Sequence, residues 1–201
     1  MFESARLDAH RQFDEFDCGN EALNSWLRGL ARRADSSGIA HVYVRTPVGE
    51  QKVCAYYAIC PTEVIRNDAG ISGALAGGYS RIPGYLIARL ALDASLHGHG
   101  YGAQLLLDAL DKIVRAAEIG GGRLIVVDAI DDEAYEFYEH FDFIPVRNRR
   151  GRLVMKMSTA ASALRAVEDQ HRGQKCAGTN LGPHALPVPE RTARSCTICS
   201  P

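Results

Sequence analysis

The chain has no long apolar run and no cysteine pattern that would brace a small secreted fold. No segment approaches the roughly 20 consecutive apolar residues that a membrane-spanning helix needs. Residues 1–10 lack the apolar stretch of a signal peptide. The six cysteines have no framework spacing within the first 160 residues, so free thiols are expected there. We therefore expect a cytoplasmic protein.

A large excess of charge of one sign is also missing, since 23 basic and 24 acidic side chains leave a net charge of −1. This balance argues against a general nucleic-acid-binding protein. The charges are unevenly distributed, because residues 28–89 hold eight basic and four acidic side chains, and residues 143–157 hold five basic and no acidic ones. Basic segments could gather on one face, although solvated surface charge is an equally good interpretation at this point.

The 201 residues, 46% of them hydrophobic, are enough for one domain with a real core. Their periodicity predicts a mixed β-sheet flanked by helices. Short apolar runs predict strands at residues 41–45, 52–60, 85–92, 124–127, 143–146 and 153–157. Helices are predicted after an N-cap at Asn20, over residues 103–114, and after a cap at Asp131. Residues 61–84 are expected to be turn-rich with a short helix.

The character of the chain changes after Ser158. A short helical stretch at residues 160–167 precedes a segment with Gly, Pro, Arg and Cys, and we expect residues 170–201 to be disordered. The predicted organisation is one domain over residues 1–160 and a largely disordered extension over residues 161–201. The spacing of the potential zinc ligands in this extension matches no closed module, so no metal site is expected. These residues are His171, Cys176, His184, Cys196 and Cys199.

The most informative motif is a glycine loop between a predicted strand and a predicted helix. Gly98, Gly100 and Gly102 permit a tight turn that aims backbone N–H groups into one concavity at a helix N-terminus. Such a site can bind a diphosphate without a basic side chain. A Walker A loop is excluded because Ala103 and Gln104, rather than Lys and Ser or Thr, follow the last glycine. A dinucleotide-binding fingerprint is excluded because it has the spacing G-x-G-x-x-G, whereas the spacing here is G-x-G-x-G. A bare loop is the remaining alternative.

This loop resembles that of the GNAT superfamily of acetyltransferases, whose form is Q/R-x-x-G-x-G/A, with His97 in the first position. The resemblance implies the GNAT fold and acetyl-CoA as cosubstrate, with no metal. It also implies that the strand backbone binds the pantetheine amides and that the loop amides bind the pyrophosphate. Because His97 departs from the pattern, we expect weakened rather than lost cofactor binding. The implied cofactor residues are Leu90, Ala91, Leu92, His97, Gly98, His99, Gly100, Tyr101, Gly102, Ala103 and Asp131.

A second segment, residues 134–143, resembles the superfamily pattern A-x-x-F-Y-x-x-x-G-F. It matches Tyr138 to the tyrosine that commonly protonates the departing CoA thiolate, a task that suits a phenol within hydrogen-bond reach. Core packing beside its aromatic neighbours is the alternative role for Tyr138, and Tyr135 is a weaker rival donor. Asp142 stands where the superfamily has glycine, which puts the geometry of that turn in question.

Four further segments, at residues 16–27, 53–59, 87–93 and 127–138, resemble the GNAT toxins of bacterial type II toxin–antitoxin systems. The resemblance covers roughly residues 5–157. It implies acetylation of the α-amino group of aminoacyl-tRNA, which blocks translation. It also implies a homodimer that is neutralised by a small DNA-binding antitoxin.

The residues are compatible with this chemistry. An α-amino group with a pKa near 7.7–8.0 is appreciably neutral at cytoplasmic pH, so no strong general base is required. The sequence offers no obvious base, and Glu63 and His41 are weak candidates for one. The arginines expected to contact tRNA are Arg28, Arg32, Arg33, Arg81 and Arg89, with Arg66 and the turn 147–152 as further contacts. Arg89 could instead be structural. Two alternatives stay open: a GNAT enzyme that acetylates a small-molecule amine or a protein N-terminus, and an inactive module that binds CoA or RNA.

Overall fold

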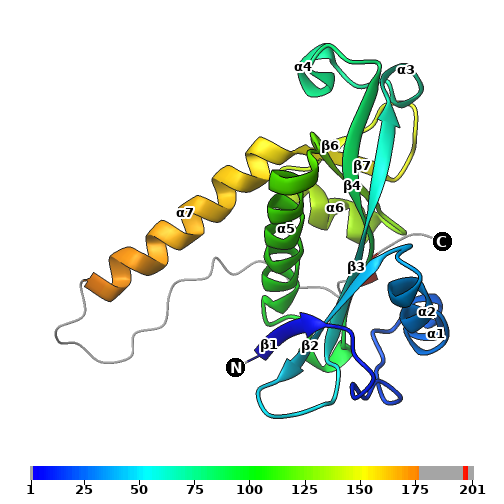
Figure 1. The fold of residues 1–201 in the computed structure, drawn as a ribbon, viewed down its shortest axis with the longest axis vertical. Helices are drawn as coiled ribbons and strands as arrows, with labels where there is room; N and C mark the ends of the chain where they lie inside the picture. Colours follow the sequence, from blue (N-terminus) through cyan, green and yellow to red (C-terminus); the bar gives the residue numbers. More distant parts are fainter. Residues whose placement is uncertain (1, 177–196, 199–201) are drawn as a thin grey trace.

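The computed structural model describes residues 2–176 and 197–198 and has one mixed β-sheet at its centre (Figure 1). The strand order is β1-β2-β3-β4-β5-β7-β6, and β8 pairs with β4 outside this path. Among these strands β4 and β5 pair in parallel, and the other pairs are antiparallel. The strands are β1 (Phe2–Arg6), β2 (His41–Pro47), β3 (Ala55–Ile65), β4 (Arg81–Leu92), β5 (Leu124–Asp128), β6 (Ile144–Pro145), β7 (Arg152–Lys156) and β8 (Thr197–Ile198).

Helices cover both faces of the sheet (Figure 1). They are α1 (Glu21–Gly29), α2 (Ala31–Ser36), α3 (Arg66–Ala69), α4 (Gly73–Ala76), α5 (Tyr101–Gly120), α6 (Asp132–His140) and α7 (Met157–Cys176), with a 3₁₀ turn η1 (Ala94–Leu96). One face carries α5 and α6, and the first part of α7 packs against α5. The other face carries α1 and α2 near one end of the sheet and α3 and α4 near the other. The predicted mixed α/β sheet is confirmed.

The largest part of the core lies between the sheet and α5. Leu105, Leu106, Ala109, Leu110 and Ile113 are all buried, and they recur at the spacing that puts them on one side of a helix. Each fully buried leucine or isoleucine side chain contributes about 1.5–3 kcal/mol. This apolar stripe fixes α5, and with it the glycine loop at its N-terminus, against the middle of the sheet.

The long β3–β4 hairpin differs from the sequence prediction. The sequence predicts turns over residues 61–84, but β3 continues to Ile65 and β4 already begins at Arg81. The misleading signals are Pro61 and Pro83. Pairing of β3 with β2 ends at Ile59, so Pro61, which has no N–H, lies where one side of β3 has no neighbouring strand. Pro83 precedes the first residue of β4 that pairs with β5.

The C-terminal region also departs from expectation. The predicted short helix over residues 160–167 lies within the longer helix α7, which runs from Met157 to Cys176. Thr197 and Ile198 form β8, and the rest of the predicted disordered tail, with His184, lies outside the described residues. None of the described helices combines the length and apolar character required to cross a membrane.

Candidate active site

The centre of the site is the place where β4 and β5 part. These strands pair only from Gly84 to Ile87 on β4, opposite Leu124 to Val127 on β5. At Gly84 they are so close that any side chain would collide with the carbonyl oxygen of Leu124. Beyond Ile87, β4 continues to Leu92 without pairing to β5. An extended chain can therefore pair with this part of β4 from within the sheet, as β8 does at Leu90 and Ala91.

The glycine loop closes one end of this gap. After β4 the chain makes the η1 turn, and Gly98 and Gly100 have φ angles of 77° and 75°, which is the left-handed region that favours glycine. Gly100 is the N-cap of α5, and no side chain among the described residues caps this helix. The first N–H groups of α5 therefore lack a side-chain acceptor, and together with the helix dipole they favour an anion at this position. The ring of Tyr101 packs edge-on against Phe2 of β1, with centroids 5.1 Å apart, which holds the start of α5 to the sheet.

The histidines of the loop stabilise its turn. The Nε2 atom of His97 lies 2.9 Å from the carbonyl oxygen of Leu92 and forms a hydrogen bond with it. The Nδ1 atom of His99 lies 2.7 Å from the carbonyl oxygen of His97. The carboxylate of Asp93 accepts a hydrogen bond from the Ser95 N–H at 3.0 Å, which caps η1. The residue that departs from the GNAT pattern thus ties the end of β4 to the glycine loop.

Tyr138 lies on the α6 side of the gap. Its side chain is fully buried in the same cluster as Ile87, Leu90 and Val127, the residues around the point where β4 and β5 part. Its ring packs against Phe143, with centroids 5.2 Å apart. Core packing, the alternative role considered for Tyr138, is therefore observed, and the ring belongs to the buried cluster around the gap.

Two acidic residues position α6. Asp131, predicted to bind the cofactor, is the N-cap, and its Oδ1 accepts a hydrogen bond from the Ala134 N–H at 2.7 Å. Its carboxylate is thus already occupied in holding the helix. Asp142, at the usual glycine position, has a φ of 62°, the one left-handed non-glycine residue in the described chain. The turn therefore keeps the glycine-type backbone, and Phe143 still enters the core.

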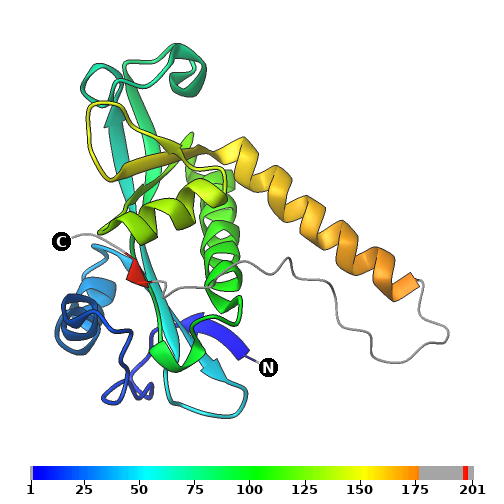
Figure 2. The same ribbon diagram turned by 180° about the vertical axis from the view of Figure 1, so that it is seen from behind.

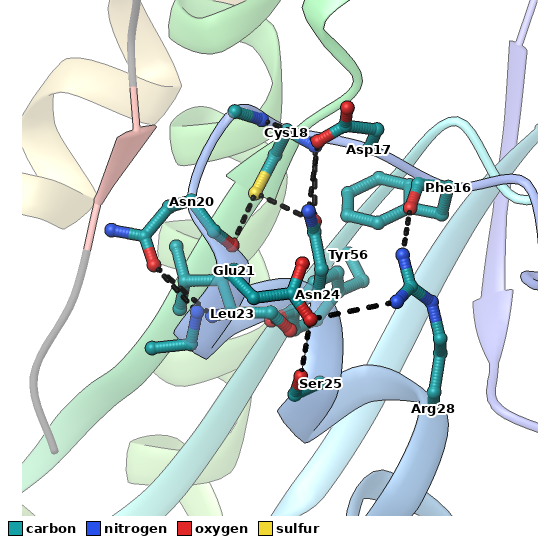
Figure 3. A network of polar contacts seen from close by, with 12 residues as sticks. Phe16, Asp17, Cys18, Asn20, Glu21, Leu23, Asn24, Ser25, Arg28 and Tyr56 are labelled. Carbon is teal, nitrogen blue, oxygen red and sulfur yellow. Dashed lines mark hydrogen bonds and ion pairs between the residues drawn. The ribbon is translucent and has the colours of Figure 1, made fainter.

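The other side of the sheet carries α1, which is held by buried polar contacts (Figure 3). The side-chain amide of Asn24 donates to Asp17 at 2.8 Å, and its oxygen accepts from the Cys18 N–H at 3.0 Å. The hydroxyl of Tyr56 on β3 donates to the carbonyl oxygen of Leu23 at 2.9 Å. Burial raises the pKa of the Cys18 thiol, so this sulfur stays protonated. These bonds fix α1 relative to β3.

This anchoring creates a stack that the sequence does not reveal. The ring of Trp26 on α1 stacks on Tyr56, with centroids 5.8 Å apart and an angle of 12° between the planes. The guanidinium of Arg89 lies 5.3 Å from the centroid of the Trp26 ring. Arg89 is half-buried on β4, next to the gap. Arg89 thus has a structural role and also lies close to the site. Its contact with Trp26 could not be predicted from the sequence, because it depends on how α1 crosses the sheet.

The other predicted tRNA-contacting arginines have different surroundings. Arg32 donates to the carbonyl oxygens of Ala9 and Arg11 and lies over the ring of Phe13. Arg81 forms an ion pair with Glu63. This pair lies before Gly84, whereas the gap begins after Ile87, at the other end of the paired segment of β4 and β5. Glu63 is therefore poorly placed to act as a base in the gap.

Arg28 and Arg33 are both exposed. Arg28 donates to the carbonyl oxygen of Phe16 at 3.0 Å and lies 3.7 Å from Glu21. Arg33 has no side-chain partner among the described residues. His41, the other candidate base, is exposed on β2, and β3 separates this strand from β4.

A basic cleft lies at the end of β5 and is lined in part by the turn 147–152, which the sequence analysis names among the expected tRNA contacts. It measures about 780 Å³ and lies between the start of α6, including Tyr135, and the loop that joins β6 to β7. Arg152 is fixed by two bonds to Asp128, of 2.6 and 2.5 Å. Arg147, Arg149 and Arg150 are exposed, and within the described residues none of them has an ion-pair partner.

The backbone of this loop is nevertheless held firmly. The side chain of Asn148 donates to the carbonyl oxygen of Asn67 at 3.2 Å, and the Ala129 N–H donates to Gly151 at 2.7 Å. Val146 is buried in the core beside α3 and α4. The loop thus presents, from a fixed position, three guanidinium groups that have no ion-pair partner in the part of the chain that the structure describes, an arrangement that suits a polyanion.

Comparison with known proteins identifies the family. The tRNA-acetylating toxin of Mycobacterium tuberculosis (strain ATCC 25618 / H37Rv) is 36% identical over 133 residues, which cover 64% of this chain and 75% of that protein. The chain belongs to the GNAT family of tRNA-acetylating toxins. The predicted resemblance to these toxins is therefore confirmed, as is the predicted fold. No family model matches the chain.

Two solved structures support the assignment to this toxin family. AtaT complexed with acetyl-methionyl-tRNAfMet superposes with a TM-score of 0.73 and 28% identity, over 85% of this chain and 99% of that one. A tyrosine-to-phenylalanine variant of AtaT, bound to the C-terminus of the antitoxin AtaR and to acetyl-CoA, superposes with a TM-score of 0.70 and 27% identity. The latter covers 82% of this chain and 99% of its own.

Proposed function

We propose that this toxin transfers the acetyl group of acetyl-CoA to the α-amino group of aminoacyl-tRNA and thereby blocks translation. The observation that carries the proposal is the gap between β4 and β5, which ends at an uncapped helix N-terminus. A relative named as a tRNA-acetylating toxin, and AtaT in complex with acetyl-methionyl-tRNAfMet, support the choice of substrate.

The residues around the gap fit acetyl-CoA. The backbone of Leu90, Ala91 and Leu92 can pair with the two amides of the pantetheine arm, since an extended backbone pairs at two of these residues in the structure. The N–H groups of residues 98–103 can bind the pyrophosphate at the start of α5. His97 holds the loop to Leu92, and Asp131 acts indirectly by capping α6. When bound, acetyl-CoA supplies the acetyl group as a thioester.

Tyr138 is proposed as the proton donor. Acetyl transfer to an amine expels a thiolate, and a phenol beside it can supply the proton that the thiolate needs. The ring is fully buried among Phe137, Phe143 and the strand residues, so its hydroxyl has a fixed direction. Tyr135 lines the basic cleft instead, and partial burial raises the pKa of its hydroxyl. It is a less direct candidate because its side chain is only partly buried and packs against the edge of the cluster that contains Tyr138.

No general base is assigned. The α-amino group of an aminoacyl ester resembles a peptide N-terminus, whose pKa near 7.7–8.0 leaves an appreciable neutral fraction at neutral pH. The two residues considered as a general base from the sequence, Glu63 and His41, lie away from the gap. The enzyme can therefore act by selecting the neutral amine and positioning it.

The tRNA is proposed to contact two groups of arginines. The first is the loop with Arg147, Arg149 and Arg150, whose charges have no partner in the described chain. The second contains Arg28 and Arg33 on the α1–α2 side, with Arg89 closest to the gap. Phosphate contacts of this kind set the register of the nucleic acid but carry no sequence information. Arg32 and Arg81, and to a lesser degree Arg28, are engaged within the protein and are expected to contribute less.

We further propose a small DNA-binding antitoxin and a homodimer as the partners. AtaT is described as bound to its antitoxin AtaR, and the AtaT–AtaR complex as bound to DNA. Light scattering on the purified chain, alone and with the protein encoded beside it, measures both associations.

The experiment that tests the function is transfer of a labelled acetyl group from acetyl-CoA. The acceptors are charged tRNA, the same tRNA after deacylation, polyamines and peptides with a free N-terminus. Label on charged tRNA alone supports the proposal. Label on a polyamine or a peptide, with none on charged tRNA, would replace it with the alternative of an ordinary GNAT enzyme.

A further inference from the structure

The last strand, β8, occupies the gap in the sheet. Thr197 pairs with Ala91 and Ile198 with Leu90, antiparallel to β4. β8 also lies against α6, the helix that carries Tyr138 (Figure 2). β8, which is more than 100 residues from Leu90 and Ala91 in the sequence, thus lies between β4 and α6, at the middle of the proposed active site.

This position coincides with the proposed site of the pantetheine arm. Neighbouring strands lie about 4.8 Å apart, so the side of β4 that faces β5 has room for one extended chain at residues 90 and 91. Each backbone N–H and C=O group of β4 on that side can serve one such partner at a time. Residues 197–198 and the pantetheine amides therefore cannot pair with Leu90 and Ala91 together.

We propose that the C-terminal segment at Thr197 and Ile198 is an intramolecular competitor of acetyl-CoA, which must leave β4 before the cofactor binds. The inference rests on the cofactor site proposed above and adds a means of regulating it. AtaT with acetyl-methionyl-tRNAfMet is matched over 99% of its length by only 85% of this chain, so this chain has residues without a counterpart there.

The size of the effect follows from the competition. A molecule whose C-terminal segment is paired cannot bind the cofactor, so the apparent dissociation constant rises as the fraction of open molecules falls. A two-residue strand pairs weakly by itself, but attachment to the same chain gives it an effective concentration in the millimolar range. Pairing in nine molecules of ten raises the apparent dissociation constant about tenfold.

The test uses the full-length chain with Thr197→Pro and Ile198→Pro together. Proline has no N–H and disrupts strand pairing, so β8 should be lost while residues 2–176 keep their fold. The matched control is Ala185→Pro, which adds a proline to the same C-terminal region away from β8. Calorimetry with acetyl-CoA should give a dissociation constant about tenfold lower for the double variant than for the control and the natural chain. Equal constants for all three would overturn the inference.

A second measurement needs no substitution. Hydrogen exchange of a peptide spanning residues 195–201, followed by mass spectrometry, should become faster when saturating CoA is added, although ligands usually slow exchange. Unchanged or slower exchange would also overturn the inference. Failure of the proposed function gives a different result, since none of the three chains would then bind acetyl-CoA.

Discussion

His97 and Leu92 are joined by a hydrogen bond of 2.9 Å between the imidazole Nε2 and the strand's carbonyl oxygen. This bond connects the last residue of β4, where the proposed pantetheine site ends, to the loop where the proposed pyrophosphate site begins. The histidine replaces the glutamine or arginine of the GNAT pattern, and it stabilises the turn from the side of the strand. Cofactor affinity should therefore depend on this side chain.

We predict that His97→Ala raises the dissociation constant of acetyl-CoA about fivefold, as expected from a net loss of ~1 kcal/mol for one hydrogen bond. His97→Gln, which restores a side chain that can form hydrogen bonds, should bind within twofold of the natural chain. Calorimetry measures both. Equal affinity in the alanine variant would show that the bond has no part in shaping the loop.

For the reaction itself, we predict that Tyr138→Phe lowers kcat by about 100-fold or more, the usual contribution of a positioned proton donor. Affinity for acetyl-CoA should change little, because the ring keeps its packing against Phe143. Tyr135→Phe is the control and should retain most of the activity. Quenched acetylation assays measure kcat, and the Tm of each variant shows whether a lower kcat reflects lost stability instead of lost proton donation. A fully active Tyr138→Phe enzyme would remove the assigned role.

The basic cleft makes a prediction about salt. Replacing Arg147, Arg149 and Arg150 with Gln should raise the KM for charged tRNA about tenfold and leave the affinity for acetyl-CoA unchanged. The dependence of tRNA binding on salt should weaken, by a slope of about 0.7–0.9 for each phosphate that an arginine no longer neutralises.

Arg115→Gln on α5 is the matched control, since that exposed arginine is already paired with Asp111. It should leave both the KM and the salt dependence unchanged. If the triple variant behaves like this control, the cleft does not bind tRNA.

The turn after α6 makes a prediction about stability. Asp142 has a left-handed backbone with a φ of 62°, which is costly for most side chains and free of strain for glycine. Asp142→Gly should be about 1 kcal/mol more stable than Asp142→Ala in urea unfolding. Equal stability of the two variants would mean that the turn relaxes to another conformation.

The half-buried thiol of Cys54 predicts a loss of stability at alkaline pH. Burial raises the pKa of Cys54 from 9.0 to about 11. The unfolded chain therefore releases this proton first, so the stabilisation is complete below pH 9 and is lost as pH rises toward 11. The free energy of unfolding should fall less steeply over this range in Cys54→Ala than in the natural chain. Parallel pH profiles would show that this thiol ionises alike in both states.

The sequence is most informative where local patterns determine local structure. The stripe of leucines in α5, the cap at Asp131 and the buried run of β5 are set by spacing and by adjacent residues, and all are observed. The glycine loop is predictable for the same reason, because its conformation depends on residues without side chains.

Features that depend on distant residues could not be predicted in this way. The stack of Arg89 on Trp26 requires the path of α1 across the sheet, and the separation of Arg32 from the free arginines depends on the loop at residues 9–13. Pro61 indicates a turn in the sequence alone, because the missing neighbour of β3 is visible only in the assembled sheet. The pairing of β8 likewise joins residues far apart in sequence.

The most direct measurement is the mass of the 3′-terminal aminoacyl-adenosine released by nuclease from charged tRNA after incubation with the protein and acetyl-CoA. Our account predicts one acetyl group on the α-amino nitrogen with the natural chain, and almost none with Tyr138→Phe in the same time. Unmodified aminoacyl-adenosine from a folded protein that binds acetyl-CoA would contradict it.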